Sequence, residues 1–328
     1  MAYHQHAQSN KKNSDNMRLL LGIACVVIVV LILFIVFNQN HTSSLSSTTT
    51  IRNATTSLVT STVNTTTIVQ AVDNPTNYNG QAPVIFTQST TLTGDIVTTS
   101  NITILLRGVV VNTEGYSLIS GGTFDNQGSI ATGLATNGNE SATYSYGGSG
   151  GGGWAFGCGN AGGGSAAYNG GSSVVAGGSG LNNGFDQAAG SGTSGSTPSP
   201  TLDTLDIQTM YNNNIRQYLE GAGGGSAYNC GSTESGGSGS YGVYIQADNV
   251  IAGNINAGAQ SGSGASEEAS GGGGGGAILI SYGLGGYLSG TYNYSGGAAG
   301  IATYGKAGSG GSGGIITYSY SSSPPITP

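Results

Sequence analysis

The chain has 328 residues, and its composition is unlike that of an ordinary enzyme. Glycine accounts for 62 residues, whereas Asp, Glu, Lys and Arg together make up 6 %. Typical proteins have about 7 % glycine and about 25 % charged residues, which argues against a cytosolic enzyme with a charged, solvated surface. Collagen is excluded because glycine has no three-residue period and only 7 prolines are present. Simple disorder fits poorly, because 37 % of the residues are apolar and 18 are tyrosine.

An uninterrupted apolar segment lies near the N-terminus, from Leu19 to Phe37. As a helix with a rise of 1.5 Å per residue it would be about 28 Å long, which matches a bilayer core of about 30 Å. The alternative is a cleaved signal peptide, whose apolar run is usually shorter, about 7 to 15 residues. The segment therefore predicts a retained transmembrane helix over residues 19–37.

Basic residues predict the orientation of this helix. Lys11, Lys12 and Arg18 precede it, and the next basic residue is Arg52. The positive-inside rule then places residues 1–18 in the cytoplasm and everything after Phe37 outside the cell, or outside a host membrane if the protein is viral.

Glycan acceptor sequences agree with this orientation, because all of them follow the apolar segment. The candidate acceptors are Asn40, Asn53, Asn64, Asn101, Asn139 and Asn293. Three of them lie within residues 38–83, which are rich in Ser and Thr and nearly free of charge until residue 73. This composition predicts a glycosylated, extended stalk, with an unmodified flexible linker as the alternative.

The remaining chain, residues 84–320, reads as an all-β domain, followed by a disordered tail at 321–328. Strand-length runs rich in branched and aromatic residues alternate with turn-forming residues. The predicted strands are Val84 to Phe86, Ile102 to Leu106, Val109 to Val111, Tyr241 to Gln246, Ala277 to Tyr282 and Ile315 to Tyr320.

Three stretches share the spacing of one strand, a turn and a glycine corner. Leu118 and Gly128, Val243 and Gly253, and Ile280 and Gly290 are each ten residues apart. Such units are expected of stacked β-coils. They resemble the coils of haemagglutinin-type secreted β-helices, and the resemblance implies a right-handed parallel β-helix, with an irregular β-sandwich as the alternative.

A second repeat is made of glycine runs. The sequence GGGSAAYNGGS at 162–172 matches GGGSAYNCGS at 223–232, and residues 147–153 and 271–276 are almost pure glycine. Isolated glycine runs are flexible. Beside β-coils they are expected as extended loops in close contact, covered by Tyr side chains and Trp154. In composition they are similar to glycine-rich phage tail adhesins, and this resemblance implies packed polyglycine helices.

One segment departs from the β pattern. Residues 201–220 place six apolar side chains close to one helical face, with Thr201 as the N-cap and Gly221 as the stop. The segment predicts one amphipathic helix that packs on the β-domain; a helix that binds a partner is the alternative.

Cys158 and Cys230 are the two cysteines outside the apolar segment. Because an exterior compartment permits oxidation, they are the candidates for a disulfide that closes a loop of about 70 residues and stabilises the fold by about 4 kcal/mol. Two free thiols are the alternative.

Catalytic chemistry has few candidates in this chain. All three histidines, His4, His6 and His41, precede the β-domain, so we expect no Ser-His or Cys-His pair, no metal site and no cofactor. The remaining enzymatic option is a β-helix that cleaves polysaccharides with two carboxylates. The candidates are Asp125, Asp186, Asp203, Asp206, Asp248, Glu267 and Glu268, of which Glu267 and Glu268 are expected in a solvated loop.

Net charge argues against nucleic-acid binding. Beyond Phe37 there are 4 basic and 13 acidic residues, a balance of 4 minus 13, or minus 9. Anchor, stalk and glycine-rich domain together resemble glycine-rich, membrane-anchored surface proteins of thermoacidophilic archaea and their viruses. That resemblance implies a non-enzymatic structural or adhesive protein with glycans or surface proteins as partners, in an unspecified oligomeric state. A polysaccharide-acting enzyme and a virion surface protein are the alternatives.

Overall fold

The computed structural model describes residues 70–135, 146–156, 160–161, 164, 167–168, 174–175, 178–182, 187–192, 194, 202–229, 232–321 and 323–328. The chain divides into two compact units, Met1–Thr65 and Thr66–Pro328, and every described residue belongs to the second unit. The predicted span Leu19 to Phe37 lies outside the described residues, and within those residues no helix is long and apolar enough to cross a membrane.

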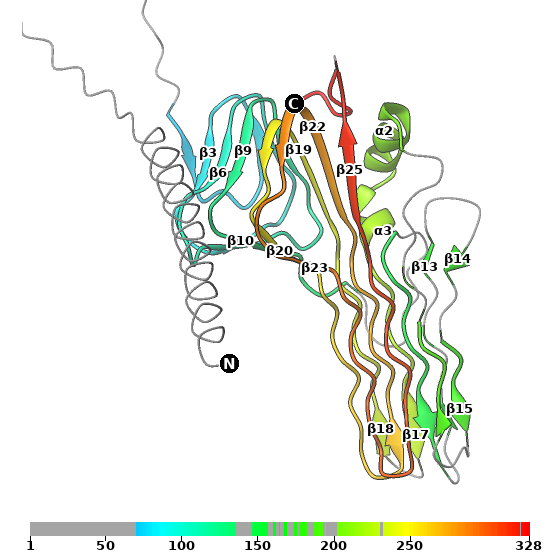
Figure 1. The fold of residues 1–328 in the computed structure, drawn as a ribbon. Coiled ribbons are helices and arrows are strands. Elements are labelled where there is room, and N and C mark those ends of the chain that lie inside the picture. The colour runs from blue at the N-terminus through cyan, green and yellow to red at the C-terminus, as the bar shows by residue number, and fades with distance from the viewer. Residues whose placement is uncertain are drawn as a thin grey trace, which may run out of the picture. The chain divides into compact units, whose positions relative to one another are not determined.

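Parallel strands form three faces that wrap around one apolar core (Figure 1). The first face contains β2 (Tyr78–Gly80), β5 (Ile96–Thr98), β8 (Leu118–Ser120), the first half of β19 (Val243–Ile251), the first half of β22 (Ile278–Tyr287) and β25 (Ile315–Ser319). The second face contains β1 (Val72–Asp73), β3 (Val84–Phe86), β6 (Ile102–Ile104), β9 (Thr123–Asn126) and the second halves of β19 and β22. The third face contains β4 (Thr90–Thr91), β7 (Val110–Asn112), β10 (Ser129–Ala131), β20 (Asn254–Asn256) and β23 (Tyr292–Asn293). The chain visits the faces in this order and then begins again, so the domain is strand-rich with curled parallel sheets, consistent with a β-helix-like fold.

Side chains in register fill the interior of these coils. On the third face Val111, Ile130 and Ile255 are paired across neighbouring strands, and all three are buried. The other two faces contribute similar inward-facing aliphatic residues to the same cluster. Because complete burial of each such side chain stabilises the fold by about 1.5–3 kcal/mol, this interior is the main apolar core.

The predicted strands are present, with boundaries that shift by a few residues. The glycine corners also agree, because the pairing of Ser129 with Asn254 and of Ile255 with Tyr292 stacks Gly128, Gly253 and Gly290. One predicted register is wrong. Ile245, and not Val243, pairs with both Leu118 and Ile280.

The reason for that error is a difference in how the coils turn. A two-glycine turn, Gly121–Gly122, separates β8 from β9, whereas β19 continues through the same corner as one strand. A β-bulge in β22 then adds one residue there, since Ala247 pairs with Tyr282 but Asn249 pairs with Gly285. Equal spacing to the glycine corner therefore does not mean equal position in the coil.

Two helices cover the outer side of the first face. The structure has α2 (Thr204–Asn212) and α3 (Ile215–Leu219) where the sequence predicted one helix. The break is at Asn214, whose φ of 67° is left-handed. The predicted cap Thr201 lies outside the described residues, and Asp203 caps α2 through a capping box with Asp206. Ile207, Met210, Ile215 and Leu219 pack against outward-facing residues of the first face, so the predicted packing on the β-domain is confirmed.

The domain extends beyond the limits that the sequence suggested. Val72 pairs with Val84 and Tyr78 with Ile96, so strands precede residue 84. At the other end the backbone of Ile326 accepts a hydrogen bond from Gln246 Nε2 (2.6 Å) and donates one to Gln246 Oε1 (2.9 Å). Residues assigned to the stalk and to the tail thus take part in the fold.

Glycine-rich excursions leave the coils at one corner. Each begins where a strand of the third face ends, after β10, β20 or β23, and each returns at the start of a strand of the first face, β19, β22 or β25. The extended segments of these excursions form what we call the glycine bundle (Figure 1). Its members are residues 147–153, 164, 178–180, 189–192, 221–226, 235–240, 257–264, 270–276, 294–300 and 307–314.

Hydrogen bonds in the glycine bundle have a period of three residues. Along 271–276 the N–H groups donate in turn to three different segments, 221–226, 307–314 and 257–264, and then repeat that order. The acceptors are Gly225, Gly308, Gln260, Ala222, Gly311 and Ala257, at 2.7–3.1 Å. Three residues per turn without internal hydrogen bonds is the geometry of the polyproline II helix.

The carbonyl groups of this central segment bond to three more neighbours. Those of residues 271–275 accept from segments 235–240, 147–153 and 294–300; the donors are Gly237, Gly151, Gly297, Ser240 and Gly148. Segment 270–276 is thus surrounded by six others, and the expectation of packed polyglycine helices is confirmed.

This packing explains the run of six glycines. A Cβ at any position from 271 to 276 would overlap a backbone oxygen of a neighbouring segment, so no side chain fits. The described glycines with positive φ are Gly108, Gly115, Gly133, Gly253 and Gly290, all outside the glycine bundle. Close approach of backbones, rather than left-handed conformation, therefore requires glycine in the bundle.

We predict that Gly274→Ala destabilises the protein, because its Cβ would overlap the carbonyl oxygen of Gly148. Overpacking of this kind costs about 1–3 kcal/mol or more. Denaturant unfolding of the full chain in detergent measures the change. The matched control is Gly314→Ala, where a Cβ meets nothing within 4 Å, so the free energy of unfolding stays level or rises by about 0.4–1 kcal/mol. Equal stability of the two variants would contradict the packing.

Candidate functional site

Short strands close the glycine bundle at the end far from the coils, and we call this region the distal tip (Figure 1). It contains β11 (Trp154–Ala155), β12 (Asn160–Ala161), β15 (Leu181–Asn182), β16 (Gln187–Ala188), β17 (Ala227–Asn229), β18 (Ser232–Glu234), β21 (Glu268–Ala269), β24 (Gly305–Lys306) and the turn at 301–304. A separate hairpin, β13 (Ala167–Tyr168) with β14 (Val174–Val175), belongs to the same excursions. The distal tip is the place where side chains return after the glycine segments.

A small core anchors the distal tip. Trp154 is completely buried and packs with Ala189, Ala269, Ala302 and Ala307. A side chain at Gly305 would overlap the indole ring, so this glycine lets the strand lie directly on Trp154. Trp154 was predicted to cover the glycine runs, and it lies instead against Gly305 of β24, outside the glycine bundle.

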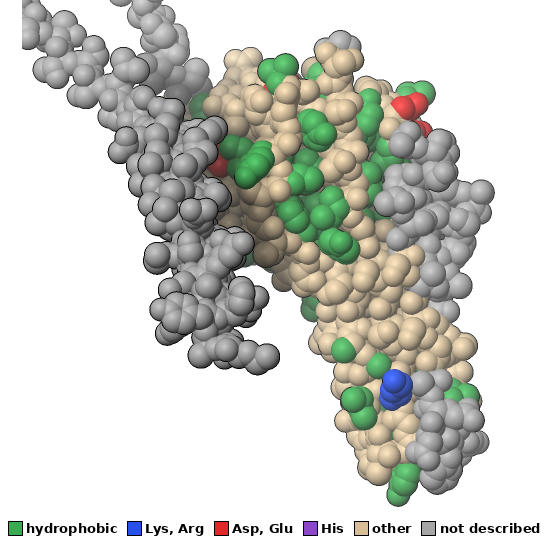
Figure 2. Space-filling model, viewed as in Figure 1, with side chains coloured by type: hydrophobic (Ala, Val, Ile, Leu, Met, Phe, Trp, Pro, Cys, Tyr) green, Lys and Arg blue, Asp and Glu red, His purple; other side chains and the backbone are tan. Residues whose placement is uncertain are grey.

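Aromatic rings continue from this core to the surface. The Phe156 ring stacks on Trp154 with centroids 6.3 Å apart, and the Tyr304 ring lies 5.8 Å from Phe156. Tyr228, Ile301 and Tyr304 are 46 %, 74 % and 39 % exposed. Figure 2 shows apolar atoms and a basic group toward this end of the molecule. Exposed aromatic side chains on a rigid base are typical of recognition surfaces.

The carboxylates named for a polysaccharide-cleaving enzyme are dispersed. Asp203 and Asp206 lie together, but they form the cap of α2. Asp125 accepts from Gln127, Asp248 from Tyr320 and Glu267 from Asn229, at 2.7–3.2 Å. Asp186 lies outside the described residues. The described carboxylates with hydrogen-bond partners therefore lie apart, at the cap of α2, at two separate places on the coils and at the distal tip. In each place they serve local structure.

Glu268 differs from its predicted position. The sequence suggested a solvated loop for both glutamates, and Glu267 is exposed, but Glu268 is buried in β21. Its neighbour in the pairing is Ala155, beside Trp154 in β11. Glu267 precedes β21, whereas both residues of β21 are buried by its pairing with β11, which the flanking small residues did not reveal.

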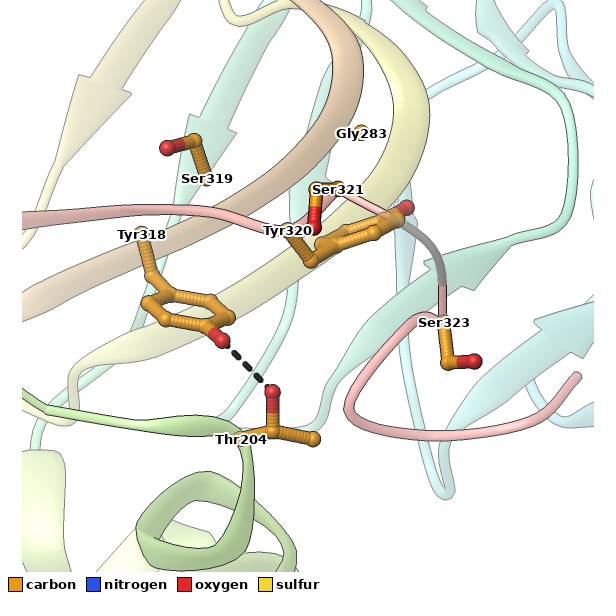
Figure 3. A pocket seen from close by; sticks show the side chains of 7 residues that line it. All are labelled: Thr204, Gly283, Tyr318, Ser319, Tyr320, Ser321 and Ser323. Carbon is orange, nitrogen blue, oxygen red and sulfur yellow. Dashed lines mark hydrogen bonds between the residues drawn. The ribbon is translucent and has the colours of Figure 1, made fainter.

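A second candidate site is a hollow between α2, β22 and the end of the chain (Figure 3). This hollow of about 410 Å³ is lined by Thr204, Gly283, Tyr318, Ser319, Tyr320, Ser321 and Ser323. The Tyr318 and Thr204 hydroxyl groups are 2.5 Å apart, and Tyr320 donates to Asp248 at 3.2 Å. The site is rich in hydroxyl groups from segments more than 100 residues apart, so no local sequence pattern predicts it.

Burial keeps the phenols near this hollow protonated. Desolvation raises the pKa of Tyr211, Tyr244 and Tyr320 well above the usual value of 10, and the Asp95 and Asp248 carboxylates raise the pKa of Tyr211 and Tyr320 further. These groups therefore remain neutral in acid and at neutral pH.

Of the predicted sequence features, two glycan acceptors fall on described residues. Asn101 and Asn293 are both exposed, while Asn40, Asn53, Asn64, Asn139, Cys158 and Cys230 lie outside the described residues. Asn101 uses only its Oδ1, which accepts from Thr123 N at 2.8 Å. Asn293 uses both ends of its amide, donating to Asn256 Oδ1 (2.8 Å) and accepting from Ser295 Oγ (2.7 Å).

Metal-binding groups are absent from the described residues, in which no three His, Cys, Asp or Glu side chains lie close enough to hold an ion.

Comparisons with protein-family models, with curated proteins and with solved structures give no match for this chain. The function must therefore be inferred from geometry and chemistry.

We predict that Asn101 is glycosylated to a higher occupancy than Asn293. A glycan on Asn293 must attach to an Nδ2 that already donates to Asn256, and it takes one of the two hydrogens there, whereas Nδ2 of Asn101 has no partner among the described residues. Glycopeptide mass spectrometry of the native membrane fraction measures both occupancies. Equal or higher occupancy at Asn293 would contradict the prediction.

We also predict that stability falls in alkali and not between neutral pH and pH 9. The folded pKa of the buried phenols lies above the unfolded value of about 10, so their contribution is complete below about pH 10 and is lost as pH rises through the folded pKa. Denaturant unfolding at a series of pH values, with phenolate absorbance recorded in parallel, tests this. In Tyr320→Phe the alkaline loss is smaller; a loss of stability below pH 9 that follows phenolate formation would refute the assignment.

Proposed function

We propose that this chain is a non-enzymatic, membrane-anchored surface protein whose distal tip adheres to a glycan or protein on another surface. The observation that carries the proposal is the group of exposed side chains, Tyr228, Ile301 and Tyr304, at the end of a bundle that otherwise offers mostly backbone and small side chains. In this proposal the coils are the right-handed parallel β-helix of a glycosylated ectodomain.

Rigidity of the glycine bundle supports this role. Segment 270–276 is hydrogen-bonded to six neighbours, and each such bond contributes about 0.5–1.5 kcal/mol net. A bundle held in this way keeps the distal tip at a fixed distance from the coils. Binding then requires little ordering of the presented groups, which is favourable for affinity.

The anchor and the stalk supply the rest of the proposal. The apolar segment from Leu19 to Phe37, preceded by basic residues, predicts a single span with the β-domain outside. The acceptors at Asn40, Asn53 and Asn64 predict a glycosylated spacer between the membrane and the β-domain. A virion protein of the same architecture would use the distal tip in the same way.

We predict that replacing Tyr228, Ile301 and Tyr304 together by Ser lowers adhesion at least tenfold. Central aromatic groups commonly contribute 2 kcal/mol or more each to an interface. The test measures binding of the full chain in nanodiscs to cell envelopes isolated from the source organism.

The matched control replaces Ile251, Leu284 and Tyr287 together by Ser. These residues are 38 %, 84 % and 68 % exposed, but they lie on β19 and β22 of the coils. Adhesion of the control stays at the level of the unchanged protein, with thermal unfolding used to confirm that both variants fold. Equal losses in the two variants, or no loss in the first, would refute adhesion through the distal tip.

A further inference from the structure

A polar groove follows the outer side of the third face. Two hollows, of about 520 and 320 Å³, share Ser129 and Asn254 and thus adjoin. The lining residues that matter for a ligand are Arg107, Gly108, Gly253, Asn254, Asn256 and Gly290. We call this the ladder groove, because its residues come from neighbouring strands in register.

Two amide groups in the ladder groove are held in one orientation. Asn254 Oδ1 accepts from the backbone N–H of Thr291 (2.8 Å) and from its hydroxyl (3.2 Å). Asn256 Oδ1 accepts from Asn293 Nδ2 (2.8 Å) and from Gly258 N (3.1 Å). Since both oxygens are occupied by the next coil or the following turn, the NH₂ groups are the ends left for a ligand.

These NH₂ groups make no hydrogen bond with the described residues. Asn254 and Asn256 are both exposed, and as residues i and i+2 of one strand they project from the same face. The ladder groove therefore offers two donors at a fixed spacing, already oriented by the fold.

Arg107 adds a positive charge at one end. It is exposed and has no ionic partner among the described residues. The other described basic residues are elsewhere: Arg216 lies 3.9 Å above the Tyr241 ring and 5.1 Å from the Tyr116 ring, and Lys306 belongs to the distal tip. The lining contains no carboxylate. Arg107 is thus the one charged side chain of the lining, and the Asp125 carboxylate, which accepts a hydrogen bond from Gln127 of the lining, lies outside it.

Glycine keeps this end of the groove open. Gly108 has a φ of 95°, and a Cβ at that position would meet nothing within 4 Å. Gly253 and Gly290 also have positive φ and line the same hollow. Backbone without side chains leaves room beside Arg107 for a ring-sized group.

We propose that the ladder groove binds an extended glycan chain that carries an anionic substituent. Ring hydroxyl oxygens accept hydrogen bonds from the amides of Asn254 and Asn256, and a carboxylate or sulfate pairs with Arg107. An extended ligand fits because the donors follow one another along the strand and across coils that lie about 4.8 Å apart. A charge-assisted bond to Arg107 supplies preference for the acidic form.

We expect the glycan ligand to carry only a few acidic groups. The balance of minus 9 after Phe37 repels a polyanion, so a few acidic groups near Arg107 are favoured over a uniformly charged polymer. This site is separate from the distal tip and does not depend on the proposed adhesive function. The two are tested by different variants.

Calorimetric titration of the full chain in detergent tests the proposal. The probes are a hexamer of neutral galactose, the same hexamer with one galacturonate and the same hexamer with one sulfate. We expect one or both acidic hexamers to bind at least fivefold tighter than the neutral hexamer, and the ratio to fall toward one at high salt. The preferred acidic hexamer identifies the anion.

Variants separate the parts of the site. Arg107→Ala removes the preference for the acidic hexamer, and Arg107→Lys retains part of it. Asn254→Ala with Asn256→Ala weakens binding of all hexamers at least tenfold, while the control pair Gln88→Ala with Gln217→Ala, exposed amides elsewhere, leaves binding unchanged. Thermal unfolding confirms that the variants fold. The proposal is overturned if no hexamer binds, if acidic and neutral hexamers bind equally, or if Arg107→Ala and the Asn pair bind like the unchanged protein.

Discussion

Close contact between extended backbones is the constraint on which this structure depends. Six segments surround residues 270–276 and hydrogen-bond to them with a three-residue period, and a Cβ would overlap a neighbouring backbone at each glycine of the central run. Ordering glycine costs more conformational entropy than ordering any other residue. Hydrogen bonds in three directions offset that cost where apolar burial is absent, so the glycine bundle is stable only as a whole.

The coils determine how the glycine bundle assembles. Every excursion leaves at the end of the third face and returns to the first, so stacking of the coils brings successive excursions together at one corner. At that corner Ala257 N donates to Asn293 O (2.6 Å) and Gly276 N donates to Ala257 O (2.9 Å). These two bonds join the strand pairing of the third face to the hydrogen bonding of the glycine bundle. Side-chain burial thus defines the register of the coils, and the coils in turn align glycine segments that have no side chains to align themselves.

Prediction from sequence succeeds where residues differ in chemistry and fails where they do not. Alternating apolar residues and the corners at Gly128, Gly253 and Gly290 give the strands and the coil repeat, because burial and turn geometry are local. Lateral pairing of segment 270–276 has no such signal, since one glycine is equivalent to the next. The distal tip and the ladder groove escape prediction for another reason: Phe156 and Tyr304, or Arg107 and Asn254, are brought together only by the stacking. Glu268 is buried where the sequence predicted a solvated loop, because its burial comes from the pairing of β21 with β11, which is more than 100 residues away in the chain.

The same constraint accounts for the low charge of the chain. Within the glycine bundle a charged side chain has neither space nor water, so the charged residues that the structure describes lie on the coils, on the two helices and their caps, and at the distal tip. Few ionisable groups then follow from the architecture itself, whatever the pH of the surroundings. The phenols whose pKa is raised by burial stay neutral over the acid and neutral range, so hydrogen bonds such as that from Tyr320 to Asp248 do not depend on phenol ionisation there. Against this neutral background the guanidinium of Arg107, which has no ionic partner among the described residues, is the one charged group in the lining of the ladder groove.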